Sequence, residues 1–276
     1  MNKQEKTYLF QIAKEASKEA GQAILGFYGK DYDLEFKKNE TPLTSADLAS
    51  NEIIISHLKK TGIPILSEES EDNPARFKSG YVWIVDPLDG TKDFINQTGE
   101  FTLMIALVKK QNNNKYRPVL GLIYKPLGDV LYYALKDEGS WIQHKEKEIK
   151  QIKVSGKFKN DFLIMLTSRS HSTDMEKKVA LKLNVQKTII KGSSLKATLV
   201  ALGEGEFNFN PSPKTQEWDI CASDIIIYEA GGKFTDIQGD IIFYNKKNTS
   251  NKNGYLLSNG LIHNNIIQEI KNFLIN

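Results

Sequence analysis

The chain has very little cysteine and almost no excess of charge. Its 276 residues include one cysteine, Cys221, which excludes an internal disulfide framework and a multi-cysteine metal cluster and fits a reducing compartment. The 37 basic and 34 acidic residues leave a net charge of +3, too small to indicate a nucleic-acid partner. Disulfide-rich and nucleic-acid-binding proteins are therefore disfavoured.

Long apolar runs are also missing. No stretch approaches the ~18 consecutive apolar residues of a membrane span, and Leu9-Phe10 is followed too soon by Lys14 and Glu15 to form a secretory signal core. With 40% hydrophobic and 26% charged residues, the composition is that of a globular protein. We therefore expect a cytoplasmic protein without an integral membrane segment.

The first part of the sequence predicts two helices against an extended, largely antiparallel sheet. Apolar residues at helical spacing indicate a helix over roughly the first 28 residues, and Ser45 stands where it can cap a second helix. Residues 36–44, between the two helices, are interpreted as an exposed polar loop. The predicted strands are 63–66, 81–85, 101–108, 120–124, 130–135 and 139–143. Residues 1–155 are expected to form an α+β domain.

In the rest of the chain strands and helices alternate, which predicts an α/β domain over residues 156–276. The predicted strands are 162–166, 188–191, 206–209, 233–235 and 255–258, and the predicted helices are 174–183, 195–202, 218–230 and 261–275. The Lys/Glu-rich segment 145–157 is the expected junction between the domains. Residues 245–253, rich in Asn and Lys, are interpreted as a solvated loop.

A strand-end motif at residues 83–94 (WIVDPLDGTKDF) indicates a metal site. Pro87 forbids further ladder bonding and an Asp-Gly pair closes the turn, so the strand delivers Asp86, the Leu88 carbonyl and Asp89 to one point beyond the sheet. Carboxylate and carbonyl oxygens are the ligands that Mg²⁺ prefers. An ordinary strand-end turn without a metal is the alternative.

Acidic residues at other strand and helix ends extend this motif. Glu68 and Glu69 follow the strand 63–66, Asp47 lies at the start of the second helix, and Asp219 opens the helix 218–230. If the two strands are neighbours, Glu68 and Asp86 meet at one sheet edge. The alternatives are an acidic surface loop for the glutamates, a helix cap for Asp47, and a charge that complements the helix dipole for Asp219.

Hydroxyl groups accompany the acidic residues. Thr91 follows the turn where a helix begins, so its hydroxyl is expected beside the same point. Residues 192–196 (GSSLK) follow a strand and open a helix, where free N–H groups, two hydroxyls and a lysine form a cradle for phosphate. Short Gly-Ser helix starts without a ligand are common, and this remains the alternative.

In order and residue type, these segments resemble the inositol monophosphatase family. The resemblance is carried by residues 86–91 (DPLDGT) and by 218–219 (WD) with the following helix to the glycine pair 231–232. It implies a Mg²⁺-dependent, Li⁺-sensitive phosphatase. It also implies the combined α+β and α/β fold of that family and of the sugar phosphatases, a layered α-β-α-β-α sandwich.

One branch of the family is more similar than the others. Residues 90–94 (GTKDF) with 99–101 (GEF) resemble the CysQ-type 3′(2′),5′-bisphosphate nucleotidases, and residues 168–171 (SRSH) and 192–196 support the same branch. Asp93 stands where that branch usually has Glu. Arg169 and His171 are interpreted as structural residues, with a contact to the pocket as the alternative, and Cys221 as a core residue.

The resemblance implies two Mg²⁺ ions and a metal-activated water. The implied metal ligands are Glu68, Asp86, the Leu88 carbonyl, Asp89 and Asp219. Glu69 would orient a ligand or support a third, weaker ion. The implied catalytic residues are Asp47, Thr91 and Glu68: the Thr91 hydroxyl contacts the water and Asp47 accepts its proton.

The resemblance further implies a small bisphosphate nucleotide as substrate, with adenosine 3′,5′-bisphosphate hydrolysed to AMP and phosphate. The implied substrate-binding residues are Gly90, Thr91, Gly192, Ser193, Ser194, Lys196 and Asp219. The alternatives are a phosphatase of inositol monophosphate or another small sugar phosphate, and a catalytically inactive nucleotide sensor or RNA-binding protein. A monomer or homodimer is expected, and the family resemblance allows a peripheral place at the inner membrane.

Overall fold

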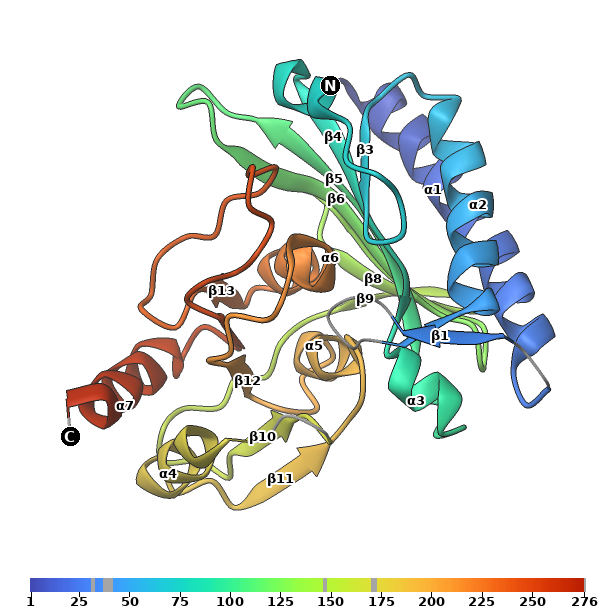
Figure 1. Ribbon diagram of the computed structural model, residues 1–276. Coiled ribbons are helices and arrows are strands. Elements are labelled where there is room, and N and C mark those ends of the chain that lie inside the picture. Colours follow the sequence, from blue (N-terminus) through green and yellow to red (C-terminus); the bar gives the residue numbers. More distant parts are fainter. Residues whose placement is uncertain (31–32, 37–41, 146–147, 170–172, 276) are drawn as a thin grey trace.

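In the computed structural model, two large β-sheets alternate with three layers of helices (Figure 1). It describes residues 1–276 apart from 31–32, 37–41, 146–147, 170–172 and 276. Within these residues, a seven-stranded sheet has the order β3-β4-β5-β6-β7-β8-β9 and a five-stranded sheet the order β11-β10-β12-β14-β13. The strands of the larger sheet are β3 (Ile65–Ser67), β4 (Tyr81–Asp89), β5 (Thr102–Lys110), β6 (Tyr116–Lys125), β7 (Val130–Leu135), β8 (Ser140–His144) and β9 (Ile149–Ile152). Those of the smaller sheet are β10 (Ile164–Thr167), β11 (Lys187–Ile190), β12 (Phe207–Asn210), β13 (Lys233–Thr235) and β14 (Tyr255–Ser258).

The first helical layer covers one face of the larger sheet. It contains α1 (Lys3–Phe27) and α2 (Ser45–Lys59). Asn2 and Glu5 form a capping box that starts α1, and its apolar stripe is buried against α2 and the sheet. Because side chains alternate along a strand, β5 sends one set of residues to this layer and the other set to the opposite face. The two sets are Leu103, Ile105 and Leu107, and Met104, Ala106 and Val108.

The middle layer is α6 (Glu217–Glu229) with α5 (Leu195–Ala201), between the two sheets. Cys221 is fully buried on α6, as predicted. Gly121 on β6 allows the helix to approach closely, since a Cβ there would lie 2.6 Å from Ile225 Cγ2 and 3.0 Å from the Ala222 carbonyl. The start of α6, which carries Asp219, is therefore fixed against the larger sheet.

The last layer covers the outer face of the smaller sheet with α4 (Asp174–Lys182) and α7 (His263–Ile275). Val179 of α4 and Ile266 and Ile270 of α7 are buried there. The order of layers is α-β-α-β-α, so the predicted sandwich is confirmed. The larger sheet ends at Ile152 and the smaller begins at Ile164, while the division into domains at residue 155 stays a prediction. In the described part of the chain, no helix is both long and apolar enough to cross a membrane.

The predicted end of the strand before Pro87 is wrong. Strand β4 continues through Pro87 to Asp89, and its register against β5 shifts between Asp86 and Asp89. The shift places one extra residue on β4, which is a β-bulge, and a bulge is where a strand tolerates proline. The motif up to Asp89 therefore belongs to strand β4 and also forms the end of that strand.

The predicted loop 36–44 is wrong at Phe36 and at residues 42–44. Strand β2 (Pro42–Thr44) pairs antiparallel with β1 (Leu34–Phe36), and Pro42 and Thr44 are buried. Residues 37–41 of that prediction lie outside the described part. The solvated loop predicted for 245–253 is wrong at Asn245 and Asn251, which are 5% and 4% exposed, because both side chains bond to other segments.

Candidate active site

The bulge of β4 is held in place by hydrogen bonds from both sides. Ser50 Oγ of α2 donates to the Pro87 carbonyl at 2.7 Å, and the Leu88 N–H donates to Asp86 Oδ1 at 3.1 Å. The chain then turns at Gly90, whose φ of +89° and close contact with Ser193 suit a residue without a Cβ. Asp86 and the Leu88 carbonyl are thus fixed at the edge of the sheet.

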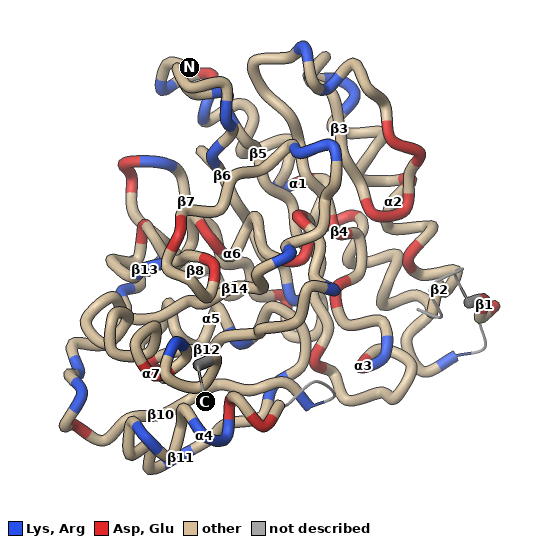
Figure 2. The backbone as a smooth tube through the Cα atoms, turned by 60° about the vertical axis from the view of Figure 1, so that its left-hand side comes forward, with Lys and Arg blue, Asp and Glu red and all other residues tan. Residues whose placement is uncertain are grey.

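Three carboxylates from separate elements meet at this edge. Strand β3 is parallel to β4 with Ser67 beside Val85, and the Glu68 N–H donates to the Val85 carbonyl at 3.2 Å. Glu68 therefore lies next to Asp86, as the sequence predicted for neighbouring strands. Asp219, at the start of α6, completes the group, and one oxygen of each of Glu68, Asp86 and Asp219 lies within 4.8 Å of the others. Figure 2 shows acidic segments close to β4, whereas Lys and Arg are spread over the molecule.

The electrostatics of the group fit a bound cation. Asp86 is 2% exposed. Burial raises its pKa well above the usual range, and the neighbouring Glu68, Asp89, Asp219 and Asp47 raise it further. Ionised carboxylates this close repel one another unless a cation lies between them. Hard carboxylate oxygens next to a backbone carbonyl are a donor set for Mg²⁺ or a similar divalent ion.

Asp47 combines the capping role with a contact to the turn. Its Oδ2 accepts hydrogen bonds from the Thr44 N–H, at 2.8 Å, and from the Thr44 hydroxyl. Its Oδ1 lies 3.1 Å from the hydroxyl of Thr91, which is also 3.2 Å from the Leu88 carbonyl. The side chain is 1% exposed. The helix-cap alternative and the predicted place beside Thr91 are therefore both observed.

The segment 192–196 is hydrogen-bonded to two acidic residues, Asp89 and Glu100. Asp89 Oδ2 accepts from the Ser194 N–H at 2.5 Å and from Ser193 Oγ at 2.8 Å, and the Gly192 N–H donates to Glu100 at 2.8 Å. The N–H groups of Gly192 and Ser194 are thus already paired, contrary to the free cradle expected from the sequence. Lys196 Nζ donates to the Ser193 carbonyl at 2.6 Å, and burial lowers the pKa of this lysine.

An ion pair between Arg169 and Glu100 lies beside this segment. Arg169 Nη2 donates to Glu100 at 2.9 Å, and its Nε lies 3.6 Å from Asp93. Lys191 Nζ donates to the other Glu100 oxygen at 2.7 Å, and these donors with the Gly192 N–H hold the pKa of Glu100 below its usual value against the effect of burial. Arg169 therefore has the structural contacts expected of it, and His171 lies outside the described residues.

A cavity of about 510 Å³ opens over the acidic group. The residues in its lining that the sequence predicted are Glu68, Asp86, Leu88, Asp89, Gly90, Thr91, Ser193, Ser194, Lys196 and Asp219. The lining also contains residues that the sequence reasoning missed: Ser168, Glu176, Asn208, Lys214 and Tyr255. Lys214 lies shortly before the Trp-Asp pair, which is a local signal, whereas Asn208 and Tyr255 are brought in by pairing of β12 with β14.

The fold and the site define a layered α/β protein whose buried carboxylates and neighbouring hydroxyls suit a divalent cation and a phosphate ester. A family model described as "Inositol monophosphatase family" matches residues 5–274. The chain therefore belongs to the inositol monophosphatase family, and it is a metal-dependent phosphomonoesterase of that family.

Individual relatives agree with this assignment. The chain is 37% identical over 237 residues to the 3′(2′),5′-bisphosphate nucleotidase CysQ of Salmonella typhimurium, covering 83% of this chain and 90% of that protein. The crystal structure of CysQ from Bacteroides thetaiotaomicron matches with a TM-score of 0.75 and 32% identity over 91% of this chain and 96% of the other. The extragenic suppressor protein SuhB of Bartonella henselae matches with a TM-score of 0.80, at 24% identity over 96% and 98% of the two chains, which shows a shared fold.

Proposed function

We propose that this chain hydrolyses adenosine 3′,5′-bisphosphate to AMP and phosphate with Mg²⁺. The reaction is supported by one observation above all: the Thr91 hydroxyl and Asp47 lie in contact beside the carboxylates of Glu68, Asp86 and Asp219. The substrate is supported by the bisphosphate nucleotidase relatives at 31–37% identity. The partner is thus a small bisphosphate nucleotide.

The proposed metal ligands are the side chains and the carbonyl that surround the bulge. They are Glu68, Asp86, the Leu88 carbonyl, Asp89 and Asp219, and Glu69 is assigned to a weaker third ion. When bound, a pair of Mg²⁺ ions neutralises charge on the phosphoryl oxygens and lowers the pKa of a water molecule. The protein's own part is to hold these oxygens together on β3, β4 and α6.

Thr91 and Asp47 are proposed to take up the proton of the attacking water. The Thr91 hydroxyl has two acceptors within reach, Asp47 Oδ1 and the Leu88 carbonyl. If the Leu88 carbonyl were to hold a metal ion, Asp47 Oδ1 would be left as the acceptor of the Thr91 hydroxyl, whose oxygen would be available to a water in the cavity. The water proton then passes to Thr91 while the Thr91 proton passes to Asp47, which is general base catalysis through a hydroxyl.

The second phosphate of the substrate requires cationic groups away from the metal ligands. The cavity lining supplies Lys92, Lys196 and Lys214. We assign the seat to these lysines, and the proposed contacts of Gly90, Gly192, Ser193 and Ser194 to the adjoining ribose and phosphate, since the Ser193 hydroxyl already donates to Asp89. The hydrogen bonds of Gly192 and Ser194 to Glu100 and Asp89 limit what their N–H groups can donate to a ligand.

The test compares phosphate release from adenosine 3′,5′-bisphosphate and from inositol 1-phosphate at equal concentration, with Mg²⁺ and with EDTA. Chromatography identifies the nucleotide product. We expect Mg²⁺-dependent formation of AMP and a clear preference for the bisphosphate. A preference for inositol 1-phosphate would overturn the substrate and leave the metal site standing, whereas binding of nucleotide without turnover would favour the sensor.

An Asp89→Asn variant checks the metal role in the same assay. The amide keeps the size of the side chain and removes its charge, so the fold is retained and turnover falls by roughly a hundredfold or more. Near-normal turnover in this variant would contradict the assignment of Asp89 as a ligand.

A further inference from the structure

The segment that follows Glu68 contains a fully buried guanidinium. Arg76 is 0% exposed in the short helix η1 (Pro74–Lys78), which follows the segment of Glu68. Its Nε and Nη2 donate to the Asp72 carboxylate at 2.6 and 2.9 Å, its Nη1 to Asn245 Oδ1 at 2.5 Å, and its Nη2 also to the Lys246 carbonyl at 3.0 Å. Asn245 Nδ2 returns a hydrogen bond to the Arg76 carbonyl at 3.1 Å. The segments of Arg76 and Asn245 are thus joined by hydrogen bonds in both directions, one of which comes from a charged group.

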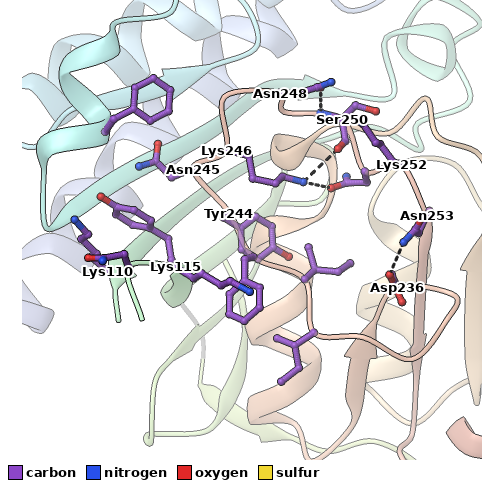
Figure 3. Close-up of a pocket in the computed structure, with 18 residues that line it drawn as sticks. Lys110, Lys115, Asp236, Tyr244, Asn245, Lys246, Asn248, Ser250, Lys252 and Asn253 are labelled. Atoms are coloured by element: carbon purple, nitrogen blue, oxygen red, sulfur yellow. Dashed lines mark hydrogen bonds between the residues drawn. The ribbon is translucent and has the colours of Figure 1, made fainter. Parts of the chain in front are cut away.

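The loop that contains Asn245 and Lys246 (residues 245–251) is also joined to the start of α6. Glu217 is 0% exposed, and its carboxylate accepts from the Asn245 and Lys246 N–H groups at 2.6 and 2.9 Å. Lys246 Nζ lies 3.8 Å from that carboxylate and donates to the Ser250 carbonyl at 3.2 Å (Figure 3). Asn251 Nδ2 donates to the Gln216 carbonyl at 2.7 Å. The loop is therefore hydrogen-bonded to Gln216 and Glu217, which lie shortly before Asp219 in the sequence.

These contacts join the two chain segments that carry Glu68 and Asp219 of the acidic group. They run from Asp72, four positions after Glu68, through Arg76 and the loop at 245–246 to Glu217, two positions before Asp219. Buried charges that are fully hydrogen-bonded resist displacement, because a broken bond leaves a group desolvated and unpaired. The separation of the two ligand-bearing segments thus depends on this network.

We propose that Arg76, Asn245 and Glu217 are positioning residues that set the distance between the Glu68 and Asp219 carboxylates, and so the affinity for the metal. This inference rests on the proposed metal role of those two carboxylates. Asn245 and Lys246 also line the cavity of about 810 Å³ shown in Figure 3, which the proposal does not involve.

The test measures Mn²⁺ binding by electron paramagnetic resonance in the absence of substrate, together with thermal unfolding. Glu217→Gln keeps the shape of the side chain but loses one acceptor, and Arg76→Lys keeps the charge but loses the planar fork. We expect each to weaken Mn²⁺ binding by up to roughly 10–100-fold, the range found when metal ligands lose their support, and turnover to recover at saturating Mg²⁺.

Glu229→Gln is the matched control. Glu229 lies at the far end of α6, and its carboxylate accepts from the Asp137 and Gly139 N–H groups at 2.9 and 3.0 Å, which is the same kind of contact as that of Glu217 but away from the start of the helix. We expect it to lower stability with Mn²⁺ affinity within about twofold of wild type. If Glu217→Gln and Arg76→Lys behave like Glu229→Gln, the positioning role is overturned. If the wild-type protein itself binds no Mn²⁺, the proposed function fails as well.

Discussion

Asp47 and Asp86 are both buried carboxylates of the site, but their surroundings differ. Asp47 accepts hydrogen bonds from the Thr44 N–H and from hydroxyls, so its charge is compensated within the protein. Asp86 accepts one from the Leu88 N–H and otherwise faces carboxylates. The first arrangement suits a proton acceptor of fixed orientation and the second a ligand whose charge needs a cation.

Asp86→Asn is expected to stabilise the metal-free protein. In the metal-free protein, burial and then the acidic neighbours oppose ionisation of Asp86 and raise its pKa well above the value in the unfolded chain, so folding at pH 7 works against this carboxyl group. The amide removes that repulsion and keeps an oxygen for the Leu88 N–H, so the free energy of unfolding in EDTA rises by roughly 1–3 kcal/mol. Urea unfolding with and without Mg²⁺ measures this. A variant less stable than wild type in EDTA would contradict the argument.

Thr91→Ala is expected to lower kcat and leave KM nearly unchanged. The variant removes the hydroxyl that contacts Asp47, and loss of such a proton-transfer group costs about 10²–10⁴-fold. Thr91→Ser, which keeps the hydroxyl, is the control and retains most of the activity. Equal activity of the two variants in steady-state phosphate release would show that the hydroxyl has no part in the reaction.

At the level of elements, the site depends on how β4 is held by its neighbours. The motif at residues 83–94 predicts the strand, the turn and the acidic residues correctly, because these follow from local patterns. The bulge at Pro87 was missed, since a bulge is defined by the register against β5 and by the bond from Ser50 on α2. The local rule that proline ends a strand was overridden by partners distant in sequence.

Ser50→Ala tests this support. The change removes the donor to the Pro87 carbonyl and leaves that buried group without its bond, which costs about 1–2 kcal/mol of stability. Because the bulge positions Asp86 and the Leu88 carbonyl, Mg²⁺ activation is expected to shift to higher concentration. Ser56→Ala is the control, since the exposed Ser56 hydroxyl donates within α2 to the Ile53 carbonyl at 2.8 Å. Equal effects of the two variants would rule out a role for Ser50 in holding the bulge.

At the level of the whole molecule, α6 links the site to both sheets. Its apolar faces pack in the core between them, while its first residues carry Asp219 into the acidic group. The second sheet also supplies the part of the cavity lining that the sequence did not indicate, such as Asn208 and Tyr255. The site is therefore complete only when the layers are assembled.

The acid stability of the assembled fold is expected to depend on His263 at the start of α7. The ring is 0% exposed and lies 2.8 Å from Ser258 Oγ and 2.9 Å from Thr235 Oγ1. Burial, with a smaller effect of Lys233, lowers its pKa to about 3 from 6.5. Below pH 6.5 the unfolded chain binds a proton that the folded protein does not, so stability falls as the pH drops towards 3.

Urea unfolding of wild type and His263→Gln across this pH range measures the effect. The stability advantage of wild type should shrink by about 1.4 kcal/mol per pH unit below the unfolded value. Other groups, including Asp86, titrate in both proteins and cancel in the difference. A difference that is constant with pH would show that His263 is not the group responsible.

The sequence by itself determined the class of fold, most of the elements, and the residues of the acidic group, because periodicity, turn chemistry and the spacing of carboxylates are local. Tertiary structure decided which of these residues touch. Parallel pairing of β3 with β4 placed Glu68 beside Asp86, and the packing of α6 brought in Asp219. Tertiary structure also paired the N–H groups of Gly192 and Ser194 with carboxylates and buried Asn245 against Arg76. Such contacts join segments far apart along the chain, and their energies depend on burial that no local pattern records.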